Sequence, residues 1–255
     1  MYAMLKTRVV PTLLLKNSVL VKSVQFGWCR PIGIPRQAVR VFNMREVDEM
    51  VILDIEARQQ DRGPIVEMVS DLAEECFMPL AIGGGIRSLE HIRELMKRGA
   101  DKVVLNTEAF ERPTLITEAA ERFGSQCIVV SIDAKQTAPG VYEVYTHAGK
   151  HPTGRDPVSW AKEAEERGPG EILLTSIDHD GMMDGYDVPL IRAVAEAVTI
   201  PVVASGGAGK LADFADAVLH GNASAVAAAS IFQYTQITPN AVKAHLRDAG
   251  VEVRL

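Results

Sequence analysis

Two short glycine-rich segments are the clearest candidates for chemistry in this chain. Gly84 and Gly85 stand in the stretch PLAIGGG, and Gly206 and Gly207 follow Ser205 in the stretch PVVASGG. Each segment follows an apolar run and precedes an amphipathic stretch. Glycine lets backbone N–H groups approach an anion closely, and a helix N-terminus favours negative charge. Both segments are therefore predicted to bind phosphate-like groups.

Each glycine-rich segment is paired with polar residues at the end of the next apolar run. Asn106 and Thr107 follow the first segment in this way, and Ala229 and Ser230 follow the second. Two such cradles predict a ligand with two phosphate-like ends, or with one phosphate and another polar group. Tight turns alone would also explain the glycines. Two related segments, each with a polar neighbour, favour ligand binding.

A carboxyl group at the end of another buried run is the best candidate for proton transfer. Asp133 ends the run VVSID, where it is predicted to act as a general acid or base. A salt bridge with Lys135 or a loop cap is the alternative. Farther along, SIDHDG contains Asp178, Asp180 and Gly181. We expect at most one of these two carboxylates to face the site, and we assign Asp178 and Gly181 to ligand binding.

Four charged residues stand at the opposite ends of the predicted strands. Arg8, Lys102 and Glu171 each open a strand, and Glu49 directly precedes one. If all four side chains point inward, they form a ring of ion pairs that closes the base of a barrel. Ordinary surface charge beside strands is the alternative that these residues alone leave open.

The elements that must position these residues alternate along the whole chain. Eight predicted strands span residues 8–15, 50–55, 79–83, 102–106, 127–133, 171–177, 201–205 and 225–230. Amphipathic stretches with helical spacing lie between them, at 65–76, 89–98, 115–123, 158–167, 188–198 and 211–219. Eight strand–helix units predict an α/β fold, a single (β/α)8 TIM barrel over residues 1–255. The site of such a barrel lies at the carboxyl ends of its strands.

A weak internal repeat refines this prediction. Residues 79–110 and 201–232 share the order strand, glycine-rich turn, helix, glycine, strand. The chain is therefore predicted to consist of two (β/α)4 halves, with one cradle from each half. Residues 135–157 are extra polar sequence that is predicted to form a small hairpin over the barrel mouth.

Composition limits the partners and the compartment. The net charge of −6 argues against a nucleic-acid-binding or anionic-membrane surface, so phosphate must be held by local backbone groups. The three cysteines are far apart in the chain, which predicts free thiols in a cytoplasmic protein and no metal site or other cofactor. No apolar run approaches the ~18 residues of a membrane span. We expect a protein that is neither exported nor inserted in a membrane.

Over nearly its whole length the chain resembles the cyclase subunit of imidazole glycerol phosphate synthase, HisF. The matching motifs are LDI at 53–55, GGGIRS, ADKVVLNT, RFGSQCIVVSIDAK, EVYTHAGK, GEILLTSIDHDG, GYD and ASGGAG. The family's barrel uses ammonia from a glutaminase subunit docked on its closed end. The ammonia enters through a charged gate and travels up the barrel interior. The resemblance thus implies a HisH-like glutamine amidotransferase partner at the N-terminal face of the barrel.

The resemblance also implies roles for individual residues. The family's charged gate is matched by Arg8, Glu49, Lys102 and Glu171. One phosphate site is matched by Gly85, Asn106 and Thr107, and the other by Gly206 and Ser230. Asp133 matches one of the family's two catalytic aspartates. Lys22 matches the lysine of the flexible first loop, residues 19–36, which otherwise departs from the family pattern.

One departure bears directly on the activity. The family's other catalytic aspartate lies in the first strand, where this chain reads PTLLLKNS and has Leu14. A leucine side chain cannot exchange a proton, so cyclisation by two carboxylates is not expected. The LLLK version resembles the HisF-like (WbuZ-type) proteins of surface-polysaccharide pathways. This resemblance implies a pathway in which a HisF-like barrel, a HisH-like glutaminase and a third protein convert an acetamido sugar to an amidino sugar. The role of the barrel there is to generate or pass on ammonia.

Three functions remain open at this point, and a phospho-sugar isomerase on the same half-barrel plan is a distant fourth, because Leu14 counts against it too. The favoured one is a HisF-like synthase subunit that channels ammonia to a phosphorylated or nucleotide-sugar ligand. The second is a cyclase of histidine biosynthesis in which another residue replaces the aspartate of the first strand. The third is a non-catalytic scaffold that docks and activates the glutaminase. Complementation of a cyclase-deficient strain separates the first two, and dispensability of Asp133 would indicate the third.

Overall fold

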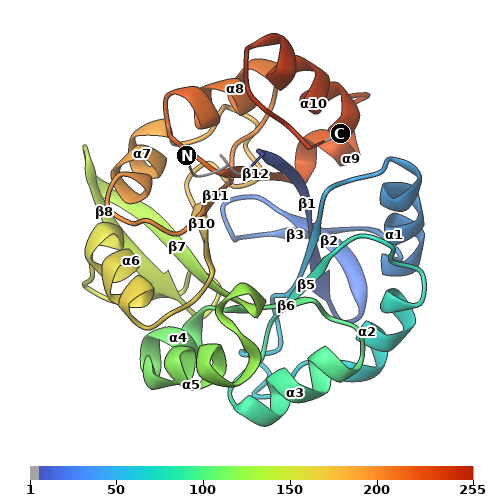
Figure 1. Ribbon diagram of the computed structural model, residues 1–255, viewed down its shortest axis with the longest axis vertical. Coiled ribbons are helices and arrows are strands. Elements are labelled where there is room, and N and C mark those ends of the chain that lie inside the picture. Colours follow the sequence, from blue (N-terminus) through green and yellow to red (C-terminus); the bar gives the residue numbers. More distant parts are fainter. Residues whose placement is uncertain (1–5, 255) are drawn as a thin grey trace.

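The computed structural model describes residues 6–254, and its centre is a closed barrel of eight parallel strands (Figure 1). The barrel strands are β1 (Arg8–Lys16), β4 (Met50–Asp54), β5 (Leu80–Gly83), β6 (Lys102–Leu105), β7 (Ile128–Ala138), β10 (Glu171–Ser176), β11 (Val202–Ser205) and β12 (Ala225–Ala228). Pairing of β10 with β7 and of β1 with both β12 and β4 closes the sheet on itself. The prediction of a (β/α)8 TIM barrel is confirmed.

Helices surround the barrel on all sides (Figure 1). They are α1 (Pro35–Met44), α2 (Val66–Ala73), α3 (Leu89–Lys97), α4 (Thr107–Glu111), α5 (Thr114–Phe123), α6 (Pro157–Glu166), α7 (Val188–Ala195), α8 (Leu211–Leu219), α9 (Ser230–Tyr234) and α10 (Pro239–Asp248), with a 3-10 turn at Ser125–Cys127. Several of these helices have a side-chain cap at their N-terminus. Ser88 accepts a hydrogen bond from the first turn of α3, and Asp187 does the same for α7. No helix within residues 6–254 is long and apolar enough to cross a membrane.

Apolar side chains fill two separate regions. The larger core lies between the helices and the outer face of the sheet, where Leu95, Ile116 and Phe214 are fully buried. The smaller core lies inside the barrel, and its members are Val10, Val51, Ala81, Val104, Val129, Leu173, Val203, Ala225 and Ala227. Since both faces of each strand are buried, the strands read as continuous apolar runs without polar alternation.

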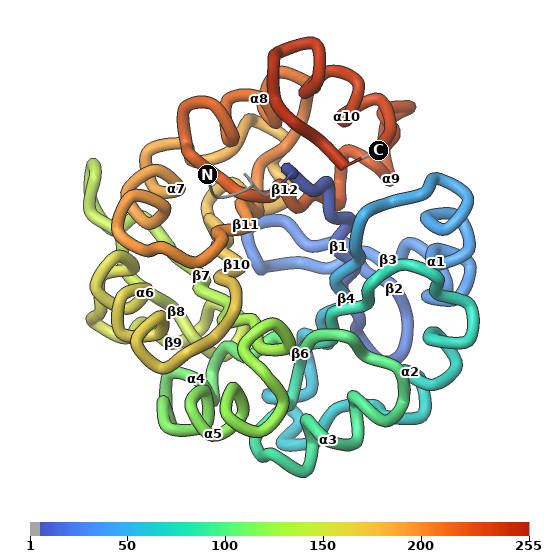
Figure 2. The backbone as a smooth tube through the Cα atoms, in the orientation of Figure 1, coloured from blue at the N-terminus to red at the C-terminus, as the bar shows by residue number. Residues whose placement is uncertain are grey.

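Two insertions add strands outside the barrel. The predicted hairpin is present, because β7 continues past Asp133 to Ala138 and pairs antiparallel with β8 (Val141–Thr146), which is followed by β9 (His151–Pro152). The first loop, residues 19–36, also contains strands. It contains β2 (Val19–Ser23) and β3 (Cys29–Gly33), and β2 pairs antiparallel with β1. In Figure 2 this segment passes across the centre of the ring of strands.

Candidate active site

One cavity occupies the carboxyl ends of the barrel strands, and most of the predicted site residues line it. From the predicted set, the lining contains Lys22, Gly84, Gly85, Asn106, Thr107, Asp133, Gly181, Ser205, Gly206, Gly207, Ala229 and Ser230. The tertiary structure thus brings both predicted phosphate cradles and the predicted acid–base group into a single pocket.

The first cradle lies at the ends of β5 and β6. Thr107, the first residue of α4, is buried, and its hydroxyl accepts a hydrogen bond of 3.0 Å from the backbone N–H of His147. The hydroxyl also donates to the side-chain oxygen of Asn106 at 3.3 Å. These contacts fix the threonine beside Gly84 and Gly85 at the rim of the cavity. An anion placed there would meet backbone N–H groups and one oriented hydroxyl.

The second cradle lies at the ends of β11 and β12, and its hydroxyl group makes fewer hydrogen bonds to the protein than that of the first cradle. Ser230 is the first residue of α9, as Thr107 is of α4. Its hydroxyl is buried and has no hydrogen-bond partner among the described residues. The hydroxyl also lines the cavity, so it is available to a polar group placed there.

Both cradles require glycine for the same physical reason. Gly84 and Gly206 have φ values of +109° and +91°, where a side chain is strained. A Cβ on Gly84 would lie 2.3 Å from the carbonyl oxygen of Asp54, and one on Gly206 would lie 2.6 Å from that of Ser176. In each case the turn packs directly against the end of a neighbouring strand. This equivalence agrees with the predicted two-half construction.

Asp133 is buried in the cavity and has an unusual environment. Burial, together with the negative charge of Asp180, raises the pKa of Asp133 to about 7. Hydrogen bonds from the side-chain amide of Asn106 at 3.0 Å and from Ser131 act in the opposite direction. A carboxyl group that titrates near neutral pH is suited to both donate and accept protons.

The two aspartates of SIDHDG are separated by the structure. Asp178 lies outside the cavity lining, and its carboxylate accepts a hydrogen bond of 2.7 Å from the backbone N–H of Gln136 on the β7–β8 hairpin. Asp180 is buried and lines the cavity, and it accepts a hydrogen bond of 3.0 Å from Ser23 on β2. The carboxylate in the site is therefore that of Asp180, whereas our assignment had placed Asp178 there.

The four charged residues at the opposite end of the strands do meet inside the barrel. Lys102 contacts Glu49 at 2.8 Å and Glu171 at 3.0 Å, and Arg8 bridges the same two carboxylates. Both glutamates are buried. Burial alone would lower the pKa of Arg8, but the charges of Glu171 and Glu49 and their hydrogen bonds together raise it. Each cation touches both anions, so the ring is fully paired.

An apolar layer separates this charged ring from the cavity. Val10, Val51, Val104 and Leu173 belong to the small core inside the barrel, and each lies two residues farther along the chain than a member of the ring. The cavity reaches down to this layer, because Val104 and other members line it. The barrel axis thus runs from paired charges through apolar side chains to a polar mouth.

A comparison with known families agrees with this architecture. The family described as histidine biosynthesis protein matches residues 8–238. The chain belongs to this family. Its members are barrel enzymes of the HisF or HisA type, so the resemblance to HisF found in the sequence motifs is confirmed at the level of the family.

Within this family, the residue at the end of the first strand stands out. Leu14 lines the cavity from β1, where it pairs with Leu53 on β4 and Val21 on β2. The register therefore places an apolar side chain where the family pattern has a carboxylate. Lys22, one residue farther along β2, is buried in the same cavity and brings an ammonium group to it.

Several lining residues were not singled out from the sequence. Thr12 and Ser131 line the cavity from within β1 and β7, and the Thr12 hydroxyl is buried with no partner among the described residues. Alternation along β1 and β7 could have identified them, because Thr12 and Leu14, like Ser131 and Asp133, are two residues apart and share a face.

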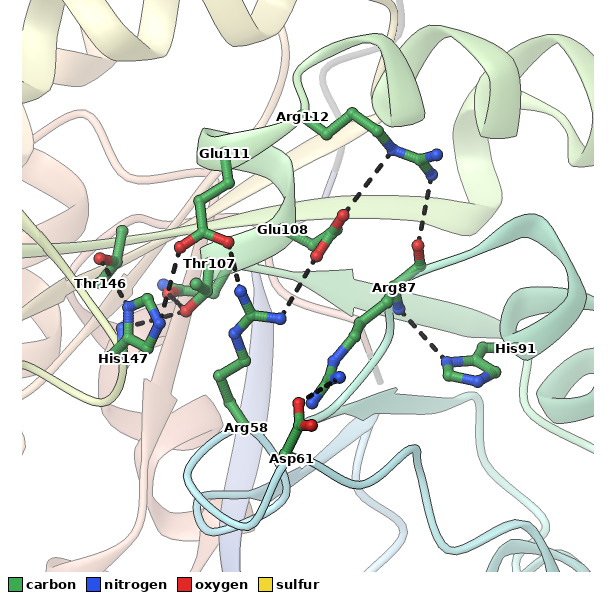
Figure 3. A network of polar contacts seen from close by, with 11 residues as sticks. Arg58, Asp61, Arg87, His91, Thr107, Glu108, Glu111, Arg112, Thr146 and His147 are labelled. Atoms are coloured by element: carbon green, nitrogen blue, oxygen red, sulfur yellow. Dashed lines mark hydrogen bonds and ion pairs between the residues drawn. The ribbon is translucent and has the colours of Figure 1, made fainter.

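A network of charged side chains forms the wall beside the first cradle (Figure 3). Arg58, in the segment after β4, contacts Glu108 at 3.5 Å and hydrogen-bonds to Glu111, both on α4. Glu111 also lies 3.5 Å from the imidazole of His147, which follows β8. This network ties three separate segments together around Thr107. Arg58 and His147 both line the cavity and are further candidates for ligand contact.

Proposed function

We propose that this barrel is the ammonia-using subunit of a two-component amidating enzyme and that it acts on a phosphorylated or nucleotide-sugar ligand. A single observation carries the proposal. One barrel axis contains a paired ring of Arg8, Glu49, Lys102 and Glu171 at its base and a cavity with two anion cradles at its mouth. Leu14 argues against the family's cyclisation with its two carboxylates.

The layered interior supports conduction of neutral ammonia. A valine-rich layer is costly for an ammonium ion to cross, because burying an unpaired charge is strongly unfavourable. Ammonia carries no charge and is small. The ring below this layer offers carboxylates and cations that can exchange contacts with an entering molecule. The proposed path therefore selects the nucleophilic form of the nitrogen.

The outer surface of the closed end supports docking of a HisH-like glutaminase. Met44 ends α1 and is 78% exposed, and Phe77, shortly before β5, is 89% exposed. Asn43 joins them, since its side chain accepts a hydrogen bond from the Phe77 N–H at 3.1 Å. Exposed large apolar side chains at this end suit a protein interface. A glutaminase seated there would release ammonia next to the charged ring.

Turnover of the cyclase family's bis-phosphate substrate by the purified chain, with excess ammonium salt, tests the proposal. Binding of the substrate without turnover is the expected result, because the cradles are present and Leu14 replaces a carboxylate. The Leu14→Asp variant is the matched test, and a gain of turnover there would show that this leucine is what prevents cyclisation. Clear turnover by the wild-type chain would instead assign it to histidine biosynthesis. Absence of binding would contradict the phosphate cradles.

A further inference from the structure

We propose that Arg58 anchors a phosphate group of the ligand beside the first cradle, and that His147 positions this arginine through Glu111. The inference rests on the proposed function only for the presence of a phosphate-bearing ligand. It adds side chains from outside the glycine-rich turns to the binding site. It also assigns the more negatively charged end of the ligand to the first cradle.

The side chain of Arg58 spans the two parts of the first cradle. Arg58 follows Ala57 in the segment after β4, and a Cβ on Gly85 would lie 2.8 Å from the Cβ of Ala57. At its other end, the guanidinium contacts two glutamates of α4, the helix that begins at Thr107 (Figure 3). The side chain is 26% exposed and lines the cavity. A ligand group held by the cradle would therefore lie within reach of the guanidinium.

The guanidinium has donors to spare for such a ligand. Arginine carries five N–H donors in a planar fork. Its Nη1 lies 3.5 Å from Glu108 and its Nη2 hydrogen-bonds to Glu111, and it makes no further hydrogen bond within the described residues. A guanidinium fork matches the oxygens of a phosphate group, and such charged hydrogen bonds are about twice as strong as neutral ones. Arg58 is thus suited to recognise phosphate in particular.

The second cradle differs because the segments that form it bring no cation to the cavity. Lys210 follows its glycines, but the side chain is 76% exposed, lies 3.9 Å from Asp213 and is absent from the cavity lining. Ser230 supplies only a hydroxyl. A guanidinium beside one cradle and a hydroxyl in the other favour a ligand with unequal ends. Its phosphate ester belongs at the first cradle, and a less charged polar group belongs at the second.

Glu111 connects Arg58 to an imidazole. One carboxylate oxygen of Glu111 hydrogen-bonds to Arg58, and the other lies 3.5 Å from Nε2 of His147. The remaining groups that face this imidazole are His151, with ring centroids 4.2 Å apart, and the Thr146 hydroxyl, 3.1 Å from Nδ1. Burial, followed by the neighbouring His151, lowers the pKa of His147, and Glu111 acts in the opposite direction. The imidazole is thus mainly neutral at pH 7 before a ligand binds.

Ligand binding and protonation of His147 are then linked. A phosphate that draws Arg58 away from Glu111 leaves that carboxylate without its cation, and a protonated His147 can take its place. The negative charge of the phosphate also favours the protonated imidazole. Binding therefore raises the pKa of His147 and takes up a proton. By reciprocity, the affinity of the first cradle should increase as pH falls through the range in which His147 titrates.

Titration with inorganic phosphate, followed by NMR of 15N-labelled glycine amides, tests the anchor without ammonia or turnover. Gly84 and Gly85 report on the first cradle, whereas Gly206 and Gly207 report on the second. Arg58→Ala should weaken phosphate binding at the first cradle by about 10-fold to 100-fold, the value of a hydrogen bond to a charged group. Binding at the second cradle should be unchanged, because that cradle does not include the guanidinium.

Arg112→Ala is the matched control for charge alone. Arg112 also lies near Glu108, at 3.7 Å, but it is absent from the cavity lining, so this variant should bind phosphate as the wild type does. Equal losses in the two variants, or no loss in Arg58→Ala, would overturn the anchor. Should Arg58→Ala fail to fold, Arg58→Lys keeps the charge without the fork and must still bind phosphate more weakly at the first cradle.

The same titration at pH 8 and pH 6 tests the role of His147. The affinity of the first cradle relative to the second should rise by about threefold to tenfold, which corresponds to a change of half a pKa unit to one pKa unit. His147→Gln should abolish this rise, whereas His220→Gln, on the exposed end of α8, should retain it. A rise that persists in His147→Gln, or is absent from the wild type, would reject the positioning role. Failure of both cradles to bind phosphate would instead contradict the proposed function.

Discussion

The two ends of the barrel bury charge in different ways. At the closed end, Arg8 and Lys102 each contact both Glu49 and Glu171, so two cations meet two anions on the regular starts of strands. At the mouth, Asp133 and Asp180 are two buried carboxyl groups in one cavity, and the side chain of Lys22, which also lines the cavity, comes from an inserted strand.

This difference separates a structural use of charge from a chemical one. Opposite charges that pair on rigid strands stabilise each other's ionised forms and stay ionised. Burial, and to a lesser extent a neighbouring negative charge, favours the protonated form of a carboxyl group, and together they raise the pKa of Asp133 to about 7. We therefore expect substitutions at the mouth to change chemistry first, and substitutions at the base to change stability and ammonia transfer.

The largest expected effect comes from Asp133→Asn at the mouth. Loss of the acid should reduce ammonium-dependent turnover of the ligand by about 100-fold or more, the usual contribution of general acid–base catalysis. Binding of the glutaminase at the far end should be unaffected. Steady-state kinetics with ammonium salt and a pull-down with the glutaminase measure the two quantities. Full activity in this variant would support the scaffold function.

The same substitution should change how stability depends on pH. Because the folded pKa of Asp133 is about 7 and the unfolded value is near 3.8, the folded state binds more protons between these values. Its contribution to the free energy of unfolding is greatest below about pH 4 and falls as pH rises to about 7, by on the order of 4 kcal/mol. Urea titrations at pH 5 and pH 8 should show Asp133→Asn gaining stability relative to wild type at the higher pH. A constant difference between the two proteins would contradict the raised pKa.

At the base, Lys102→Ala should act on both stability and coupling. Removal of one cation from the buried ring should lower the free energy of unfolding by up to about 3 kcal/mol. This is the lower end of the range for broken buried ion pairs, because Arg8 still contacts both glutamates. In a reconstituted complex, glutamine hydrolysis should continue while less product forms per glutamine, because ammonia escapes to solvent. Lys97→Ala, on the exposed surface of α3, is the control and should alter neither quantity. Unchanged coupling in Lys102→Ala would reject the gate.

The smallest effect is expected from Ser230→Ala. The hydroxyl has no partner among the described residues, so its loss should leave the free energy of unfolding nearly unchanged. Affinity for a phosphate-bearing ligand should fall by roughly fivefold to tenfold, the value of about one hydrogen bond. Isothermal titration with the bis-phosphate and thermal unfolding measure the two. A loss of stability with unchanged affinity would show that the hydroxyl serves the fold and not the ligand.

The order of the strands and helices and the position of most site residues could be predicted from the sequence. Parallel strands place their carboxyl ends together, so residues that end or follow strands, such as Gly84, Thr107, Asp133, Gly206 and Ser230, had to meet at one mouth. The same argument applies to Arg8 and Lys102 at the other end. Because side chains alternate regularly along a strand, counting residues along the chain is sufficient to predict at which end of the barrel such a residue lies.

The choice between Asp178 and Asp180 was decided only by the tertiary structure. Both follow the end of β10, where side chains no longer alternate between two faces. Contacts with other segments determine their directions: Gln136 on the β7–β8 hairpin binds Asp178, and Ser23 and Gln25 near β2 bind Asp180. These partners are distant in the chain, and no local pattern specifies them.

The sequence by itself thus determined the barrel and the two glycine-rich turns at its mouth, because these depend on strand periodicity and on backbone conformations that only glycine tolerates. Only the tertiary structure decided that the four charged residues at the base form ion pairs inside the barrel. The tertiary structure also decided that Asp180, and not Asp178, lines the cavity together with Asp133. It also decided that the first loop forms β2 and β3 over the mouth. Proton affinity depends on burial and on neighbouring charges, and both arise only when remote segments pack together.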